Sequence, residues 1–241
     1  MLIFSRKVLI MMMCIFVCIF ISQTYNLSAD IGEYRGEFGS IAINFFQAGE
    51  LETGLEELND KKDSFPERKK GSFEYYIFRS EMEMLKGEMR EIYNNDEAEN
   101  NFTAALDYAE KALAIEETTR AKRLKTEGIS RLFEYRSFFF IIRNQGQAGD
   151  LLDKIRKKEP ENKHILFLEA MSYINAPSTF GGDDEKGKDI LRDLAEGDNP
   201  IFQFLSYNKL ASLAEDENTA TEKLSEAEEI FPKSPLTGEI F

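Results

Sequence analysis

The sequence predicts an all-α protein, on the basis of three observations. All six prolines lie where helices could end, and none occurs between Glu67 and Glu159, so this interval can hold long helices because proline disrupts a helix interior. Segments such as 73–93 and 119–143 are rich in Glu, Lys, Arg, Leu, Met and Ala, which favour helix. No segment sustains the two-residue alternation of β-branched residues that is typical of a strand.

The first 29 residues have the three parts of a secretory signal peptide. Arg6 and Lys7 precede 14 uninterrupted apolar residues at 8–21, and a polar stretch ending in small residues follows. A membrane-spanning helix needs about 20 apolar residues, so this length favours a cleaved signal over an uncleaved anchor. We expect 1–29 to be removed on export and 30–241 to form one helical-repeat domain in the periplasm or elsewhere outside the cytoplasm. Retention of the segment as a membrane anchor is the alternative.

Cysteine usage and charge exclude several classes of function for the exported chain. Both cysteines, Cys14 and Cys18, lie inside the signal segment, so disulfides, thiolate catalysis and cysteine-ligated zinc are excluded. Lipidation at Cys18 is disfavoured because the bulky Val17 precedes it. The remaining 28 basic and 44 acidic residues give a net charge of −16, which repels nucleic acid. We therefore expect no nucleic-acid partner.

Motifs for catalysis or metal binding are missing from the sequence. His164 is the only histidine, and no Gly-x-Ser-x-Gly motif accompanies it, so we interpret it as a residue on a helix face. The acidic clusters at 183–185 and 215–217 lack the spacing of a calcium-binding loop and are interpreted as helix starts or solvated faces. The sequence thus predicts a protein that is not an enzyme and uses neither a metal nor another cofactor.

Internal repetition is the most informative pattern in the chain. The segment 105–115 resembles the second helix of a tetratricopeptide repeat, with small residues Ala105 and Ala112 seven positions apart. The segments 146–160 and 220–232 fit the same frame, each with a proline twelve residues after a small residue. This similarity implies a degenerate tetratricopeptide-like solenoid of about five helix pairs over most of 30–241.

The same frame places the other helices of these pairs. We expect a partner helix at 184–196 and a weaker first pair at 38–66. Small residues mark the second helices at Gly54, Ala105, Ala148, Gly187 and Ala220. The expected first helices run through Leu132, Tyr135 and Phe139, through Leu166, Ala170 and Tyr173, and through Phe204, Tyr207 and Ala211.

A loop at 173–183 stands apart from the regular repeat. Gly181 and Gly182 permit positive φ, and Asp183 is placed to cap the next helix. Acidic residues follow these glycines and no Lys-Ser/Thr is present, so a structural turn is favoured over a phosphate site. The loop, from Pro177 to Asp183, resembles one found in bacterial tetratricopeptide-like proteins, including the T-component family associated with TRAP transporters. That resemblance implies an accessory subunit of solute uptake that holds or passes an apolar ligand.

Apolar residues occupy the inner, concave positions that the frame assigns to the first helices. They are Ile43, Phe46, Phe133, Phe140, Phe167, Met171, Ile174, Phe202 and Leu205. One interpretation is that a tightly coiled or homo-oligomeric solenoid buries this stripe. The other is an apolar groove that binds a partner helix or a hydrophobic ligand. We expect an exported scaffold that binds a partner protein, or alternatively a TRAP-type accessory subunit that works with a periplasmic solute-binding protein.

Overall fold

The computed structural model describes residues 34–93 and 96–237, and within these ranges the chain is all-helical and contains no strand. The expected signal peptide, 1–29, lies outside the described residues. A search of the described helices for one long and apolar enough to cross a membrane finds none.

Ten α-helices of the described chain follow one another as five neighbouring pairs, each helix packing against the next. The pairs are α2 (Gly39–Ala48) with α3 (Leu51–Asp63), α4 (Phe73–Ile92) with α5 (Ala98–Ile115), α6 (Thr119–Leu132) with α7 (Phe138–Lys158), α8 (Lys163–Asn175) with α9 (Asp184–Ala195), and α10 (Pro200–Ser212) with α11 (Glu217–Ile230). Short 3₁₀ turns accompany them: η1 (Gly36–Phe38), η2 (Glu67–Lys69), η3 (Ser178–Phe180) and η4 (Pro235–Thr237).

Polar side chains fix the beginnings of most of these helices. Each accepts a hydrogen bond from a backbone amide in the first turn, which satisfies a donor that the helix itself cannot pair. Pro200 opens α10, where its missing amide hydrogen costs nothing. The capping residues are Ser72, Thr118, Asn162, Asp183, Asn199 and Asp216.

The predicted helical segment 119–143 is in fact interrupted. Its first part, α6, ends at Leu132, and α7 begins only at Phe138. The expected first helix through Leu132, Tyr135 and Phe139 is therefore wrong: Leu132 ends α6, Tyr135 lies in the turn, and Phe139 belongs to the second helix of the pair.

Tertiary packing explains this break better than helix propensity does. The turn brings Leu132, which is 1% exposed, and the half-buried Phe140 into one cluster with Phe102 of α5. A continuous helix would carry Phe140 away from that cluster. Ser137, whose backbone is extended with ψ of 157°, then starts α7 in a new direction.

Small residues sit where helices approach closely, as the repeat frame predicts. Ala105 and Ala112 are fully buried on α5. On α4, a Cβ atom added to Gly87 would lie 2.4 Å from the ring of Phe102, so only glycine fits there. A Cβ atom on Gly187 of α9 would likewise lie 2.6 Å from Ile174 of α8.

In the loop before α9, the predicted cap is confirmed and the two glycines have different roles. Asp183 Oδ1 accepts a hydrogen bond from Lys186 N at 3.1 Å. Gly181 has a φ of 89°, in the left-handed region that favours glycine. Gly182 does not use the positive φ that glycine permits. That residue is needed for space, because a Cβ atom there would lie 1.7 Å from the carbonyl oxygen of Ala176.

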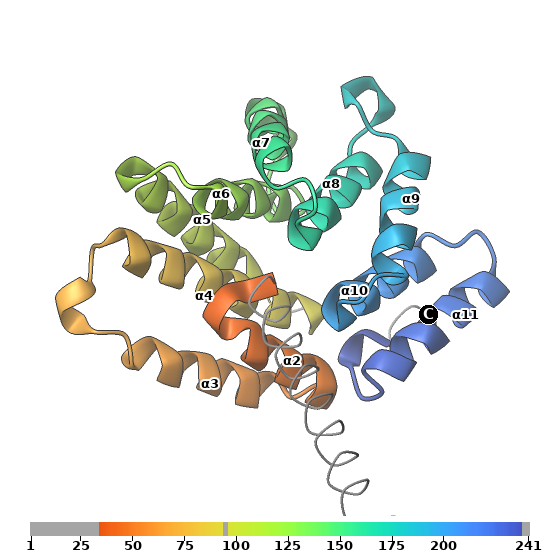
Figure 1. Cartoon of the computed structure of the whole chain (residues 1–241), viewed down its shortest axis with the longest axis horizontal. Helices are drawn as coiled ribbons and strands as arrows, with labels where there is room; N and C mark the ends of the chain where they lie inside the picture. Colours follow the sequence, from red (N-terminus) through yellow and green to blue (C-terminus); the bar gives the residue numbers. More distant parts are fainter. Residues whose placement is uncertain (1–33, 94–95, 238–241) are drawn as a thin grey trace, which may run out of the picture.

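The first and last helix pairs meet and close the arc of helices. Figure 1 shows the chain passing round from α3 to α11, with α2 on the inside between α4 and α10. Phe46 of α2 contacts Phe204 of α10, with ring centroids 5.6 Å apart, and Phe231 at the end of α11, at 6.2 Å. Phe38 contacts Phe78 of α4 at 4.9 Å. The largest apolar cluster thus joins both ends of the described chain.

One helix differs from the rest in how much apolar surface it leaves uncovered. At the start of α7, Phe138 is 66% exposed, Phe139 82% and Ile142 53%. The buried residues of α7 lie in its second half. Contiguous exposed apolar side chains are uncommon in monomeric proteins, so this patch needs an explanation.

Candidate functional site

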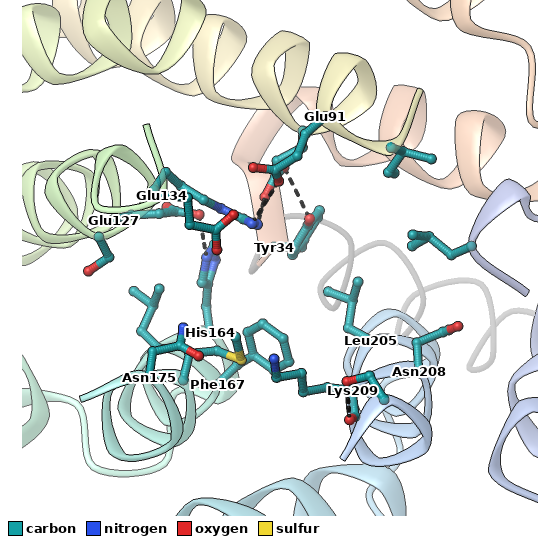
Figure 2. Close-up of a pocket in the computed structure, with 18 of the residues that line it drawn as sticks. Tyr34, Glu91, Glu127, Glu134, His164, Phe167, Asn175, Leu205, Asn208 and Lys209 are labelled. Atoms are coloured by element: carbon teal, nitrogen blue, oxygen red, sulfur yellow. Dashed lines mark hydrogen bonds and ion pairs between the residues drawn. The ribbon is translucent and has the colours of Figure 1, made fainter. Parts of the chain in front are cut away.

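A cavity of about 440 Å³ lies between α4, α6, α8 and α10 and is bounded by residues from both ends of the described chain (Figure 2). Its volume falls in the range of about 300–1,000 Å³ that is typical of small-molecule sites. One wall is apolar and includes Phe46, Phe167, Leu168, Met171 and Leu205. The opposite wall is polar and includes Tyr34, Glu88, Glu91, Glu127, Arg131 and His164.

Arg35 lies behind the polar wall and joins two of its carboxylates, Glu88 and Glu127. Its side chain is fully buried. Nε and Nη2 donate to the two oxygens of Glu88 at 3.1 and 2.5 Å, while Nη1 and Nη2 donate to the two oxygens of Glu127 at 2.9 and 2.5 Å. Paired guanidinium–carboxylate hydrogen bonds of this kind are among the strongest in proteins. Arg35 therefore ties the residues before η1 to both α4 and α6.

Three further arginines extend the network. Arg123 donates to Glu81 at 2.5 Å and to Glu127 at 3.3 Å, and Arg120 donates to Glu81 at 3.1 Å. Arg131 donates to Glu88 at 2.9 Å and to Glu91 at 3.0 Å. The ion pairs therefore match four carboxylates, Glu81, Glu88, Glu91 and Glu127, with four guanidinium groups, Arg35, Arg120, Arg123 and Arg131.

Mutual contact keeps the most deeply buried members of this network charged. Burial alone would raise the pKa of Glu127, but the Arg35 guanidinium holds that pKa well below its usual value. The same opposition acts on Glu81, whose pKa is lowered by Arg123 and Arg120 despite its burial. Burial opposes the charge of Arg35, yet Glu127 and Glu88 raise its pKa well above the usual value. The four carboxylates and four guanidinium groups of this ion-pair network thus balance in charge at neutral pH.

His164, at the start of α8, completes the network from the opposite side. Its ring stacks on Tyr34, with centroids 5.4 Å apart and an angle of 20° between the planes. Burial, followed by the positive charge of Arg123, lowers the pKa of His164, so the imidazole is neutral at pH 7. Arg123 Nη1 lies 3.0 Å from Nδ1 and 3.3 Å from Nε2, and Nε2 lies 3.4 Å from Glu127 Oε1. Because a guanidinium can only donate and a carboxylate can only accept, we assign the proton to Nε2, which faces Glu127.

Four of the nine predicted inner-face residues line the cavity. Phe46, Phe167, Met171 and Leu205 come from α2, α8 and α10. Phe202 lies directly behind the wall, fully buried, with its ring 5.7 Å from that of Tyr34 and 6.2 Å from that of Phe167.

The other four predicted residues lie elsewhere. Ile43 packs against the main apolar cluster. Ile174 faces α9, where it approaches Gly187. Phe133 and Phe140 contact each other at 6.2 Å beside the α6–α7 turn. The repeat frame thus brings together the inner faces of α2, α8 and α10 but not that of the α6–α7 region.

Sequence reasoning missed the charged half of the site. Glu81 and Glu88 are seven residues apart on α4, and Arg123, Glu127 and Arg131 follow at intervals of four on α6. Those spacings place each set on one helix face. A solvated helix face has the same pattern, so only the fold reveals that these faces point inward.

Lys209 of α10 is the one charged side chain of the apolar wall, close to Phe167 in Figure 2. It is half-buried, and its ammonium group makes no hydrogen bond or ion pair with any residue that the structure describes. Burial lowers the pKa of Lys209, a shift that the nearby Glu134 carboxylate partly opposes. By contrast Glu134, in the turn after α6, is exposed to water.

The arrangement is suited to holding a molecule with an apolar body. The buried carboxylates of the polar wall already accept hydrogen bonds from guanidinium groups, so they are not placed as free bases. The apolar wall offers aromatic and aliphatic contact. Comparison of the chain with protein-family models, curated proteins and solved structures finds no match.

Proposed function

We propose that this protein binds a small amphipathic or apolar molecule in the cavity between α4, α6, α8 and α10 and does not transform it. The observation that carries this proposal is the cavity of about 440 Å³, with an apolar wall facing a neutral, fixed network of charges. Sites of this size, mostly apolar with a few oriented polar groups, are typical of ligand-binding proteins.

The arrangement of the helices favours a small molecule over a partner helix at this place. Five consecutive helix pairs with small residues at their contacts support a degenerate tetratricopeptide-like repeat. In an open repeat array the concave face is a long groove that suits a peptide or helix. Here η1 packs against α4 and α2 against α10, both inside the arc, so the remaining space has the size of a ligand.

Within this proposal, the protein is an exported accessory subunit of a TRAP-type uptake system. The Pro177–Asp183 loop and the signal-like N-terminus support that role. A periplasmic solute-binding protein would then exchange the apolar ligand with it. The exported form should begin near Asp30 on N-terminal sequencing, and genes for a TRAP permease should lie beside this one. A mature chain that starts at Met1, or neighbours unrelated to transport, would remove this assignment without affecting the cavity.

A second candidate function is the binding of a partner protein or a second copy of the chain at the start of α7. The exposed side chains of Phe138, Phe139 and Ile142 support it, because such patches often mark interaction sites. Replacing Phe139 and Ile142 by Ser should abolish this association, measured by light scattering and by co-purification, while ligand binding persists.

The cavity itself is tested with N-phenyl-1-naphthylamine, a neutral apolar dye that fluoresces when it leaves water. We expect saturable binding of one dye per chain. Met171→Trp should fill part of the cavity and weaken dye binding about tenfold or more, since it removes space from the apolar wall. Ile115→Trp is the matched control, because Ile115 is 54% exposed on α5 and does not line the cavity. Absence of dye binding, or equal binding by both variants, would refute the proposed function.

A further inference from the structure

We propose that the natural ligand is an amphipathic carboxylate, such as a fatty acid of medium chain length, and that Lys209 receives its carboxylate group while the chain lies along the apolar wall. This inference rests on the proposed function and goes beyond it by naming the class of ligand and the residue that recognises it.

Lys209 differs from the other cation of the cavity lining in having no charged partner among the described residues. The cavity lining contains two permanent cations among the described residues, Arg131 and Lys209. Arg131 is already engaged with Glu88 and Glu91. The Lys209 ammonium has no such partner in the described chain, although it is half-buried beside Phe167. A cation that has lost part of its water without gaining a partner is a site that an anion would stabilise.

Desolvation decides between an anionic and a cationic ligand. Glu134 could in principle attract a cationic group, but it is exposed in the turn after α6, where water already stabilises it. Lys209 is partly withdrawn from water, and the lowered pKa of its ammonium agrees with this. An ion pair gains more where the surroundings are less polar, so the ligand's charge is better paired at Lys209.

The surroundings of Lys209 specify the rest of the molecule. Phe167 and Leu205 stand on the same side of the cavity as Lys209, and with Met171, which also lines the cavity, they offer contact to a hydrocarbon chain. The buried carboxylates of the opposite wall are paired with guanidinium groups, so the unpaired negative charge among the lining residues is that of the exposed Glu134. An apolar chain with one anionic end therefore matches both the shape of the apolar wall and its single free charge.

The test measures how well three probes displace the bound dye. The probes are dodecanoate, dodecanol and dodecylamine, which share the same hydrocarbon chain and are used below their micelle-forming concentrations. Dodecanoate should displace the dye at about tenfold lower concentration than dodecanol, which corresponds to about 1.4 kcal/mol, and dodecylamine should be the weakest. Lys209→Met should erase the advantage of dodecanoate and leave dodecanol unchanged. Lys209→Arg should keep most of it.

Two further variants serve as controls. Lys158→Met removes an exposed lysine at the end of α7 and should change nothing. Glu134→Gln should leave dodecanoate binding equal or tighter, because it removes a neighbouring negative charge. Equal displacement by dodecanoate and dodecanol, a preference for dodecylamine, or an unchanged preference in Lys209→Met would overturn the inference while leaving the cavity function intact. Failure of the dye itself to bind would instead refute the proposed function, and the inference with it.

Discussion

Residues 34–48 contact the rest of the molecule at two places, one through buried ion pairs and the other through aromatic rings. At one place Arg35 pairs with Glu88 of α4 and Glu127 of α6 through four hydrogen bonds in a buried setting. At the other, Phe46 packs between Phe204 and Phe231 at the far end of the chain. The two places lie eleven residues apart in sequence, and Tyr34, beside the first, and Phe46, at the second, both line the cavity.

The two kinds of contact should lose stability in different ways when a side chain is replaced. A buried ion network is balanced only when every member is present, so loss of one partner leaves a desolvated charge without compensation. In the aromatic seam formed by Phe46, Phe204 and Phe231, the loss of stability should grow with the side-chain volume that is removed, because neighbouring side chains relax into part of the space. Replacing Arg35 should therefore cause one large loss in the free energy of unfolding, whereas replacing rings of the aromatic seam should cause losses that depend on the size of the new side chain.

The largest loss is expected from Arg35→Met. Because both Glu88 and Glu127 would lose their principal partner in a buried setting, the free energy of unfolding should fall by about 4–5 kcal/mol, the upper part of the range for broken buried pairs. Urea denaturation followed by circular dichroism measures this. The control Arg192→Met breaks an exposed pair with Asp189 and should cost less than about 0.5 kcal/mol. Similar small losses for both variants would contradict the role given to Arg35.

The aromatic seam should respond in steps. Phe204→Ala removes a fully buried ring that contacts Phe46 and Phe231, so it should cost about 3 kcal/mol or more. Phe204→Leu keeps most of the volume and should cost roughly half as much. The same denaturation experiment compares them. A Leu variant as damaging as the Ala variant would show that ring geometry, and not volume, holds the two ends together.

The charge network should also make stability depend on pH. The folded state lowers the pKa of His164, so the unfolded chain binds its proton first as pH falls below the usual histidine value of about 6.5, and stability decreases from there. Between pH 7.5 and 5.5 the free energy of unfolding should fall by about 1 kcal/mol, and His164→Gln should remove most of this dependence on pH.

At more acidic pH the stability of the folded protein should fall a second time, for a different reason. The pKa values of Glu127 and Glu81 are lowered in the folded state, so their contribution is present above the usual carboxylate value and is lost as pH falls through their folded values. This decline should persist in His164→Gln. A profile that does not change between pH 7.5 and 5.5 in the wild-type protein would contradict a buried, neutral His164.

The smallest effect on stability is expected at the exposed patch. Phe139 is 82% exposed, so Phe139→Ser should change the free energy of unfolding by less than about 0.5 kcal/mol. Thermal melting measures this directly. A loss of several kcal/mol would indicate that the patch is covered in the folded protein, as it would be in an oligomer that depends on α7.

The sequence contained the helices but not the direction in which their faces point. Capping residues such as Asp183 and small residues such as Ala105 act locally, so their positions in the chain were enough to predict their roles. The α6–α7 break depends on the distant Phe102, and the closure of the arc depends on Phe46 meeting Phe204. Such contacts have no local signal in the sequence.

The candidate site was predicted only in its apolar half for the same reason. The inner-face pattern identified Phe167 and Met171 because apolar periodicity marks a buried stripe whatever covers it. Charged residues at helical spacing are usually solvated, so Arg123 and Glu127 gave no sign of burial. Arg35 precedes α2, and its burial depends on the distant Glu88 and Glu127, which surround it in the fold.

Photolabelling shows whether the cavity holds the ligand. A dodecanoate analogue with a diazirine at the end of its chain is bound to the protein and irradiated, and the labelled peptides are identified by mass spectrometry. We expect labels on α8 and α10, the helices that supply Phe167, Met171 and Leu205, and we expect these labels to disappear when unlabelled dodecanoate is added in excess. Labels concentrated on Phe138, Phe139 and Ile142 of α7, or spread over the surface without competition, would contradict binding in the cavity.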